Sequence, residues 1–465
     1  MNKSLKYIRI ILAALMLLGI TALLLDTTGL VRQWMGWAPK VQLLPAVLAL
    51  NVVLVVGVLA VTLLIGRFYC AVVCPMGIFQ DIFTWVHKVL FRKHKFTYRK
   101  PANWLRYVVL GLFVVLMVLG LNGVAVLIAP YSAYARMVTN LHATGLPLVV
   151  AWVTLVVVGV MSFGWGRLWC NTICPVGSLL SLVSRYRLFG VRLDPEKCVG
   201  CRKCEHGCKA MCIDIDNKTV DHSRCVDCWN CLGECKAGAL SFGKAIRVNK
   251  SSQDPQGAQI DASRRKFMAT TAAVGAVMAV EAQEQKLDGG LAAIMQKAVP
   301  ERKTPVKPFG ALSLKNFSSR CTACQLCVSQ CPEKVLRPST KLETLMQPEM
   351  NYTDGYCRTA CTRCSEVCPA GAIQPVTKEE KTAISIGRAI TVRQNCLSAQ
   401  GVSCGTCARH CPAAAISMVS DPATGHTVPT VDEARCIGCG ACEYYCPARP
   451  MTAIYVEGRE VHTEI

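Results

Sequence analysis

The sequence predicts an α-helical membrane domain joined to two small α+β domains that are rich in cysteine. Apolar residues make up 52% of the 465 residues and the mean hydropathy is +0.34, which is high for a soluble protein. The 29 cysteines fall in short clusters with regular spacing. Much of the net charge of +21 lies beside apolar runs, where positive charge marks a membrane face, so nucleic acid is not expected as a partner.

Four apolar runs are expected to span the membrane, at residues 10–25, 43–65, 105–128 and 146–163. Each is close to the roughly 20 residues needed to cross a hydrocarbon core. Lys and Arg are frequent between the second and third runs and after the fourth, but rare in the other two loops. The positive-inside bias therefore predicts that the N-terminus, the middle loop and the segment after the fourth run are cytoplasmic.

The predicted membrane domain, residues 1–190, holds an internal repeat. Residues 66–77 recur at 166–177, and each copy contains a Cys-x3-Cys-Pro motif. Cysteines four apart share one face of a helix, so four thiols converge if the two copies meet. Four thiolates suffice for a [4Fe–4S] cluster or another soft metal, and they could instead cycle between dithiol and disulfide. Otherwise each cysteine is a small buried residue where a span ends. The four cysteines are Cys70, Cys74, Cys170 and Cys174.

Residues 191–245 contain two Cys-x2-Cys-x2-Cys-x3-Cys motifs. This is the spacing of ferredoxins with two [4Fe–4S] clusters, in which the fourth cysteine of each motif binds the other cluster. Zinc more often binds paired Cys-x2-Cys knuckles. Cys212 is left over, and Lys209 and Lys236 replace the usual proline, where a positive charge is expected to raise the cluster potential. The expected ligands are Cys198, Cys201, Cys204 and Cys235 for one cluster, and Cys225, Cys228, Cys231 and Cys208 for the other.

Residues 246–320 are expected to be a linker that carries the chain across the membrane. The linker contains Arg264 and Arg265, followed by an apolar stretch at 267–282. A twin arginine before such a stretch is typical of the signal read by the Tat exporter, which moves folded proteins. The stretch is either cleaved or kept as a fifth span, and the sequence leaves both open. In both cases residues 321–465 are predicted to be periplasmic.

Residues 321–465 contain four further motifs with a Cys-x2-Cys-x3-Cys-Pro core. Sixteen thiolates predict four [4Fe–4S] clusters, which makes six in the whole chain. Neighbouring motifs could pair, or the second and third could nest inside a first–fourth pair. Apolar pieces at 371–373, 414–416 and 452–454 are expected to form short strands. The cysteines are Cys321, Cys324, Cys327 and Cys331; Cys357, Cys361, Cys364 and Cys368; Cys396, Cys404, Cys407 and Cys411; and Cys436, Cys439, Cys442 and Cys446.

With these motifs in place, the chain resembles a fusion of two subunits of periplasmic nitrate reduction. The first half resembles the NapH family, with four spans, two Cys-x3-Cys-Pro motifs and a two-cluster domain. The second half resembles the NapG family, with a twin-arginine signal and four cluster motifs. The MauN and MauM pair and NosR-type proteins share parts of this plan. The resemblance implies a quinol dehydrogenase of the bacterial inner membrane, which passes electrons from menaquinol or ubiquinol to a periplasmic reductase or cytochrome, most simply the nitrate reductase system.

The residues themselves also favour electron transfer over bond chemistry. The sequence contains no dinucleotide fingerprint, P-loop, nucleophile triad or haem-attachment motif. A quinol site requires a membrane-interface pocket and a proton acceptor, for which the candidates are His87, His142 and Arg136, together with Tyr131 and Tyr134. Each of these could instead be an interface anchor. Two alternatives are a maturation factor that donates electrons during assembly of a periplasmic metalloenzyme, and electron transfer of the methylamine-utilisation type.

Overall fold

A computed structural model describes residues 2–26, 29–91, 96–141, 143, 145–244, 297–422 and 424–465. The twin arginine Arg264-Arg265, the apolar stretch 267–282 and the quinol-site candidate His142 lie outside the described residues.

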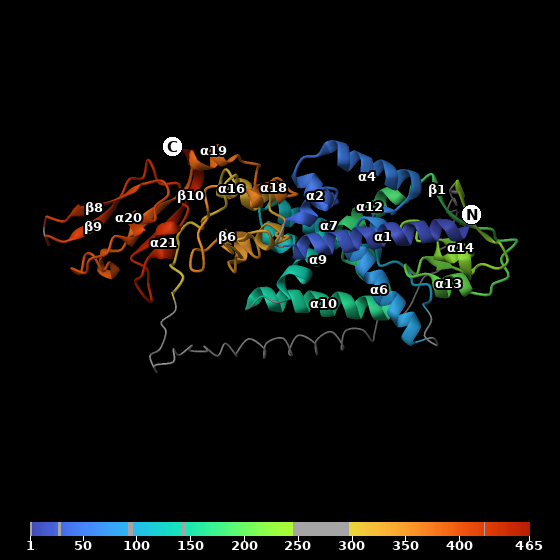
Figure 1. The fold of residues 1–465 in the computed structure, drawn as a ribbon. Coiled ribbons are helices and arrows are strands. Elements are labelled where there is room, and N and C mark those ends of the chain that lie inside the picture. Colours follow the sequence, from blue (N-terminus) through green and yellow to red (C-terminus); the bar gives the residue numbers. More distant parts are fainter. Residues whose placement is uncertain are drawn as a thin grey trace.

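Residues 2–184 form a helical domain in which α1 runs the full length (Figure 1). Its α10 packs against α6 and α9, and α1 contacts α6, α5 and α9. The helices are α1 (Asn2–Leu25), α2 (Leu30–Met35), α3 (Leu43–Leu48), α4 (Val52–Ile65), α5 (Tyr69–Val72), α6 (Pro75–Leu90), α7 (Asn103–Val118), α8 (Asn122–Ala125), α9 (Pro130–Asn140), α10 (Leu146–Trp165), α11 (Leu168–Thr172) and α12 (Pro175–Ser184).

The expectation of four full-length membrane spans is not confirmed. Among the described residues, only Leu5–Leu25 of α1 and the whole of α10 are long and apolar enough to cross a membrane. The second predicted span divides into α3 and the 14-residue α4, because the chain turns at Leu50, where φ is 56°. The third predicted span contains the 16-residue α7. The chain then turns at Gly120, where φ is 79°, before α8 begins.

Residues 189–244 form the N-terminal cluster domain, which lies at the end of the helical domain where α1 begins (Figure 1). Strand β1 (Phe189–Leu193) pairs with β4 (Leu240–Lys244) in antiparallel register, with Val191 opposite Phe242. A second hairpin joins β2 (Ile213–Asp214) to β3 (Thr219–Val220). The short helices α13 (Lys203–Gly207) and α14 (Asn230–Glu234) each contain the third cysteine of one motif and pack together.

Residues 297–465 form the C-terminal cluster domain, which lies at the opposite end of the helical domain (Figure 1). Its antiparallel strand pairs are β5 with β6, β7 with β10, and β8 with β9. Of the three predicted short strands, 414–416 and 452–454 lead into β8 and β10, whereas 371–373 forms a bend instead. The elements are α16 (Leu314–Arg320), α17 (Leu326–Ser329), β5 (Leu336–Pro338), η1 (Leu342–Thr344), β6 (Pro348–Met350), α18 (Arg363–Val367), α19 (Lys378–Thr382), β7 (Ile384–Thr391), η2 (Arg393–Asn395), α20 (Thr406–Arg409), β8 (Ile416–Ser420), β9 (Thr427–Val431), α21 (Ala441–Tyr445) and β10 (Ile454–Glu464).

Polar and apolar contacts dock the C-terminal cluster domain on the helical domain. The side-chain amide of Gln330 donates to the carbonyl oxygens of Leu23 and Asp26, which satisfies acceptors that the end of α1 leaves open. Arg32 of α2 pairs with Glu366 at 2.6 Å. The apolar part of this contact is a fully buried cluster of Val126, Ala129, Ala323 and Met346.

The close approach of α8 to η1 generates a prediction for Gly123. A Cβ on Gly123 would lie 2.7 Å from the backbone nitrogen of Leu345. Gly123→Leu should therefore push the two domains apart at a cost of about 1–3 kcal/mol. Hydrogen exchange should become faster in η1 and α17. Gly111→Leu is the control, because nothing lies within 4 Å of a Cβ there. Equal exchange in both variants would contradict this docking contact.

Candidate iron–sulfur centres and electron-transfer site

The thiols of the N-terminal cluster domain line two cavities, each with three cysteines from one motif and one from the other. The spacing predicts the same crossed grouping, while binding of a cluster remains a prediction. Cys212 also lines the second cavity, and its sulfur lies 3.6 Å from that of Cys208. Set A contains Cys198, Cys201, Cys204 and Cys235, and set B contains Cys225, Cys228, Cys231 and Cys208.

In the C-terminal cluster domain, neighbouring motifs pair with each other. This is one of the two pairings that the sequence leaves open. Three of its sets line cavities, and in the fourth, Cys331 lies within electrostatic range of Cys357 and Cys364. Set C contains Cys321, Cys324, Cys327 and Cys368; set D contains Cys357, Cys361, Cys364 and Cys331; set E contains Cys396, Cys404, Cys407 and Cys446; and set F contains Cys436, Cys439, Cys442 and Cys411.

These sites fit a [4Fe–4S] cluster by their number of cysteines and their hydrogen-bond donors. Each of the five cavities is lined by the four cysteines of its set, which is the number of ligands that one [4Fe–4S] cluster requires. Backbone amides donate to cysteine sulfurs at 3.3–3.4 Å, and such donors stabilise thiolates and tune a cluster's potential. A bound cluster would supply reversible one-electron transfer. The amides belong to Ala323, Ile373, Ala415 and Ala453.

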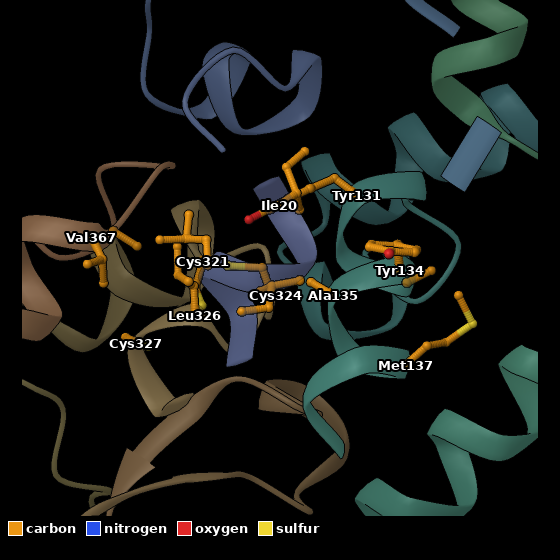
Figure 2. Packing of buried hydrophobic residues seen from close by; sticks show 14 of the residues in the cluster. Ile20, Tyr131, Tyr134, Ala135, Met137, Cys321, Cys324, Leu326, Cys327 and Val367 are labelled. Carbon is orange, nitrogen blue, oxygen red and sulfur yellow. The ribbon is translucent and has the colours of Figure 1, made fainter. Parts of the chain in front are cut away.

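The sets of the C-terminal domain lie in a row that leads away from the helical domain. Set C is beside α1 and α9: Figure 2 shows Cys321 and Cys324 near Ile20 and Ala135. Sets D and F meet where the backbone nitrogen of Cys357 donates to a carbonyl oxygen of set F at 2.9 Å. Set E lies against β8 and β9, which form the far tip (Figure 1). The spatial order is therefore C, D, F, E.

Buried cations accompany the thiol sets. The ammonium group of Lys381 donates to the sulfur of Cys357 at 3.2 Å. Lys307 lies within electrostatic range of set C, and burial lowers the pKa of its ammonium group. Arg187 is fully buried, pairs with Asp227 at 2.8 Å, and lies within electrostatic range of set B. A positive charge beside a set favours the thiolate form and the reduced cluster, which carries more negative charge.

The two lysines that replace proline have different environments. Lys236 is exposed. Lys209 is buried, and its ammonium group binds the carboxylate of Asp81 in α6. Burial lowers the pKa of Lys209 to about 8, although Asp81 favours its charged form. Lys209 therefore joins the N-terminal cluster domain to the helical domain, a role that the motif alone did not suggest.

Asp81 is a charge centre that our sequence analysis missed. It pairs with Arg167 at 2.6 Å and with Arg9 at 3.3 Å, besides Lys209. A signal was present, because Asp26 and Asp81 are the only acidic residues among the first 193. Acidic side chains that stand alone in a basic, apolar sequence are expected to hold buried cations.

The structure brings Cys70, Cys74, Cys170 and Cys174 together, and each thiol lies within electrostatic range of the other three. The expectation that each pair shares one helix face is wrong. Cys70 lies in α5, but Cys74 is extended, with ψ of 114°, and begins the separate helix α6. Cys170 and Cys174 have the same relation to α11 and α12. In both copies the proline takes the first helical position, where its missing N–H costs nothing.

The quinol-site candidates lie at opposite ends of the helical domain. His87 is packed among aromatic rings, with Phe163 edge-on at 4.7 Å. Arg136 is at the other end, in α9, where its guanidinium donates to the carbonyl oxygens of Val126 and Leu127. Arg136 and its α9 neighbour Tyr131 lie within electrostatic range of a cluster-binding thiol, that of Cys324 in set C.

Two iron–sulfur family models match parts of the chain: one covers the two Cys-x3-Cys-Pro motifs, and the other covers most cysteines of sets C to F. A family model described as a 4Fe-4S binding domain matches residues 47–96 and 144–194. One described as a 4Fe-4S dicluster domain matches residues 320–372 and 402–449. An uncharacterised protein of Methanocaldococcus jannaschii is 30% identical over 228 residues, which are 49% of this chain and 84% of that protein. No solved structure was found to match.

Two further relatives correspond to the two halves of the chain. The ferredoxin-type protein NapH of Escherichia coli is 30% identical over 36% of this chain and 55% of its own length. The ferredoxin-type protein NapG of the same organism is 33% identical over 27% of this chain and 58% of its own length. The match thus spans just over half of each. The methylamine utilization ferredoxin-type proteins MauN and MauM of Methylobacillus flagellatus are 30% and 31% identical, over 65% and 64% of their lengths.

Together, the thiol sets and the matching domains define an iron–sulfur electron-transfer protein. The chain belongs to the family of NapH- and NapG-like ferredoxin-type proteins, which confirms the resemblance.

The ion pairs of Asp81 generate a stability prediction. Asp81→Asn leaves Lys209, Arg9 and Arg167 without their carboxylate, and breaking buried pairs of this kind costs about 3–5 kcal/mol. The midpoint of thermal unfolding in detergent should therefore fall clearly. Asp194→Asn should leave the midpoint unchanged, because Asp194 pairs with Lys197 at the surface. Equal midpoints for the two variants would exclude Asp81 as a docking residue.

Proposed function

We propose that this protein is a membrane-bound quinol dehydrogenase component, which passes electrons from quinol through the C-terminal thiol sets to a periplasmic reductase. The observation that carries the proposal is the contact between α9 and set C. Tyr131 and Arg136 are buried there, 2% and 1% exposed, and both lie within electrostatic range of Cys324. An electron that leaves a donor at α9 can therefore enter set C inside the protein.

These two side chains also offer what a quinol headgroup needs. Oxidation of quinol releases two electrons and two protons, so the site requires a hydrogen-bonding group that receives protons beside a one-electron acceptor. Within the described part of the chain, the hydroxyl of Tyr131 has no hydrogen-bond partner, so it is free to bind a quinol hydroxyl. The guanidinium of Arg136 has open donors at Nε and one terminal nitrogen. Its positive charge favours reduction of set C.

The fold supports a linear route and an orientation. Sets C, D, F and E form a row from the helical domain to the tip at β8 and β9, so set E is the proposed exit to the partner. We place the N-terminal cluster domain in the cytoplasm, in accord with the Lys- and Arg-rich segments beside it, and the C-terminal cluster domain in the periplasm. Sets A and B then serve a separate donor on the cytoplasmic side.

Two partner systems are compatible with the relatives. The NapH and NapG matches support the periplasmic nitrate reductase system, which we propose as the acceptor. The MauN and MauM matches support an electron route of methylamine utilization in its place. Deletion strains discriminate between the two. Loss of nitrate-dependent anaerobic growth supports the first, and loss of growth on methylamine supports the second.

Anaerobic mixing of the full-length protein with a water-soluble quinol tests the proposed function. The protein is purified with all clusters oxidised and is placed in lipid nanodiscs. We expect cluster absorbance to bleach and EPR signals of reduced clusters to appear after quinol is mixed with the protein. If dithionite reduces the clusters but quinol does not, the quinol dehydrogenase role is excluded. Reduction by a cytoplasmic ferredoxin alone would assign the donor to sets A and B.

Arg136 gives the sharpest variant for this site. Arg136→Gln removes the positive charge beside set C, so the rate of quinol-dependent reduction should fall about tenfold or more, equivalent to about 1.4 kcal/mol. Reduction by dithionite should remain complete. Arg32→Gln is the matched control, because Arg32 lies at the same end of the helical domain but pairs with Glu366. Equal rates in the two variants would remove Arg136 from the site.

A further inference from the structure

The two Cys-x3-Cys-Pro motifs meet at the junction of the repeats, beside the N-terminal cluster domain. Their four cysteines are buried, each 3–4% exposed, and they lie outside the six ferredoxin-type sets. The proposed route from quinol to the partner does not use them. They are therefore four neighbouring thiols without an assigned role.

The two copies contact each other through two arginines, each of which donates a hydrogen bond to the other copy. Arg67 of the first copy donates to the carbonyl oxygen of Cys170 at 3.0 Å. Arg167 of the second copy donates to the carbonyl oxygen of Cys70 at 2.8 Å. The exchange relates the copies by approximate twofold symmetry. A motif that only ends a helix has no need for such contacts with the other copy.

Glycines allow a tight turn within each copy and leave room for the arginine of the other copy, because a Cβ on Gly177 would also lie 2.8 Å from a terminal nitrogen of Arg67. A Cβ on Gly77 would lie 2.2 Å from the carbonyl oxygen of Cys70, and a Cβ on Gly177 would lie 2.3 Å from that of Cys170. No side chain fits at either position. The sequence pattern Cys-Pro-x-Gly therefore serves the geometry of the four-thiol site as well as the turn into the next helix.

The surroundings of the four thiols carry an excess of positive charge. Arg67, Arg106 and Arg167 are each 0–1% exposed. Only Arg167 has a carboxylate partner, Asp81, whereas in the described chain Arg67 and Arg106 donate to neutral oxygens. Buried charges require compensation. Four thiolates at this place would supply it.

Two sulfurs already accept hydrogen bonds of the kind that thiolates receive. The side-chain amide of Gln80 donates to the sulfur of Cys170 at 3.1 Å. The backbone nitrogen of Gly177 donates to the sulfur of Cys174 at 3.2 Å. Such donors stabilise sulfur ligands of iron–sulfur clusters.

We propose that Cys70, Cys74, Cys170 and Cys174 together bind one [4Fe–4S] cluster that is shared between the two repeats. The segments matched by the 4Fe-4S binding family model, 47–96 and 144–194, contain these four cysteines and no others. Each segment holds only two, so neither can supply four ligands alone. A 2+ core with four thiolates has a net charge of about −2, which Arg67 and Arg106, the two buried arginines that donate to neutral oxygens, offset. On binding, each thiol loses its proton and forms one Fe–S bond.

The location gives this centre a neighbour with which to exchange electrons. The backbone nitrogen of Arg167 donates to the carbonyl oxygen of Lys209 at 2.9 Å, and Lys209 directly follows Cys208 of set B. Asn171 donates to the carbonyl oxygen of Ala210 at 3.3 Å. The shared centre thus lies next to set B and gives the clusters of the N-terminal domain a path into the helical domain.

Iron and sulfide analysis of the anaerobically purified full-length protein tests the proposal without an activity assay. The variant Cys74→Ser with Cys174→Ser should lose about four iron atoms and four sulfides per chain. Cys201→Ser in set A is the positive control for loss of one cluster. Ser178→Ala, a buried position in α12, the helix that follows the second motif, should keep the full iron content.

A milder variant distinguishes a role in cluster binding from an effect on folding. Gln80→Leu removes only the hydrogen bond to the sulfur of Cys170, so it should keep all iron while the EPR signal of one cluster shifts. Three outcomes overturn the proposal: unchanged iron in the double cysteine variant, stoichiometric zinc in the wild-type protein, or a disulfide among the four cysteines after alkylation of the native protein. The result is independent of whether quinol reduces the protein.

Discussion

The constraint on which this structure depends is charge compensation around buried sulfur. Every cluster-binding set places negative charge inside the protein, and an uncompensated buried charge costs several kcal/mol. Cations that are buried next to the thiols compensate this charge, such as Lys381 beside set D and Arg187 beside set B. Part of the net charge of +21 therefore lies inside the protein, in addition to the charge on the predicted cytoplasmic face.

The same constraint joins the domains. At one end of α1, Asp81 holds Arg9, Arg167 and Lys209, so that a single carboxylate links the helical domain to set B. At the other end, the buried Arg136 lies beside set C, and Gln330 closes the end of α1. The helical domain consequently holds one cluster domain at each end. That arrangement supports the proposal that the two cluster domains lie on opposite sides of a membrane.

Cysteine spacing predicted the crossed sets of the N-terminal cluster domain and the total number of motifs, because ligand geometry fixes the distances between thiols along the chain. Spacing could not decide which motifs pair in the C-terminal domain, since both pairings satisfy it. Hydropathy did not reveal the helix breaks at Leu50 and Gly120. A positive φ at one residue redirects the backbone but does not change the pattern of apolar side chains. The part played by Asp81 and Lys209 also needed the structure, because it arises from contacts between residues 128 positions apart.

The most direct test is to determine on which side of the membrane each cluster domain lies. Right-side-out spheroplasts carrying one epitope tag after residue 465 and another in the β2–β3 hairpin are treated with external protease. We predict that the C-terminal tag is digested while the hairpin tag is protected until the membrane is opened. Digestion or protection of both tags together would place the two cluster domains on one side, and would contradict the account.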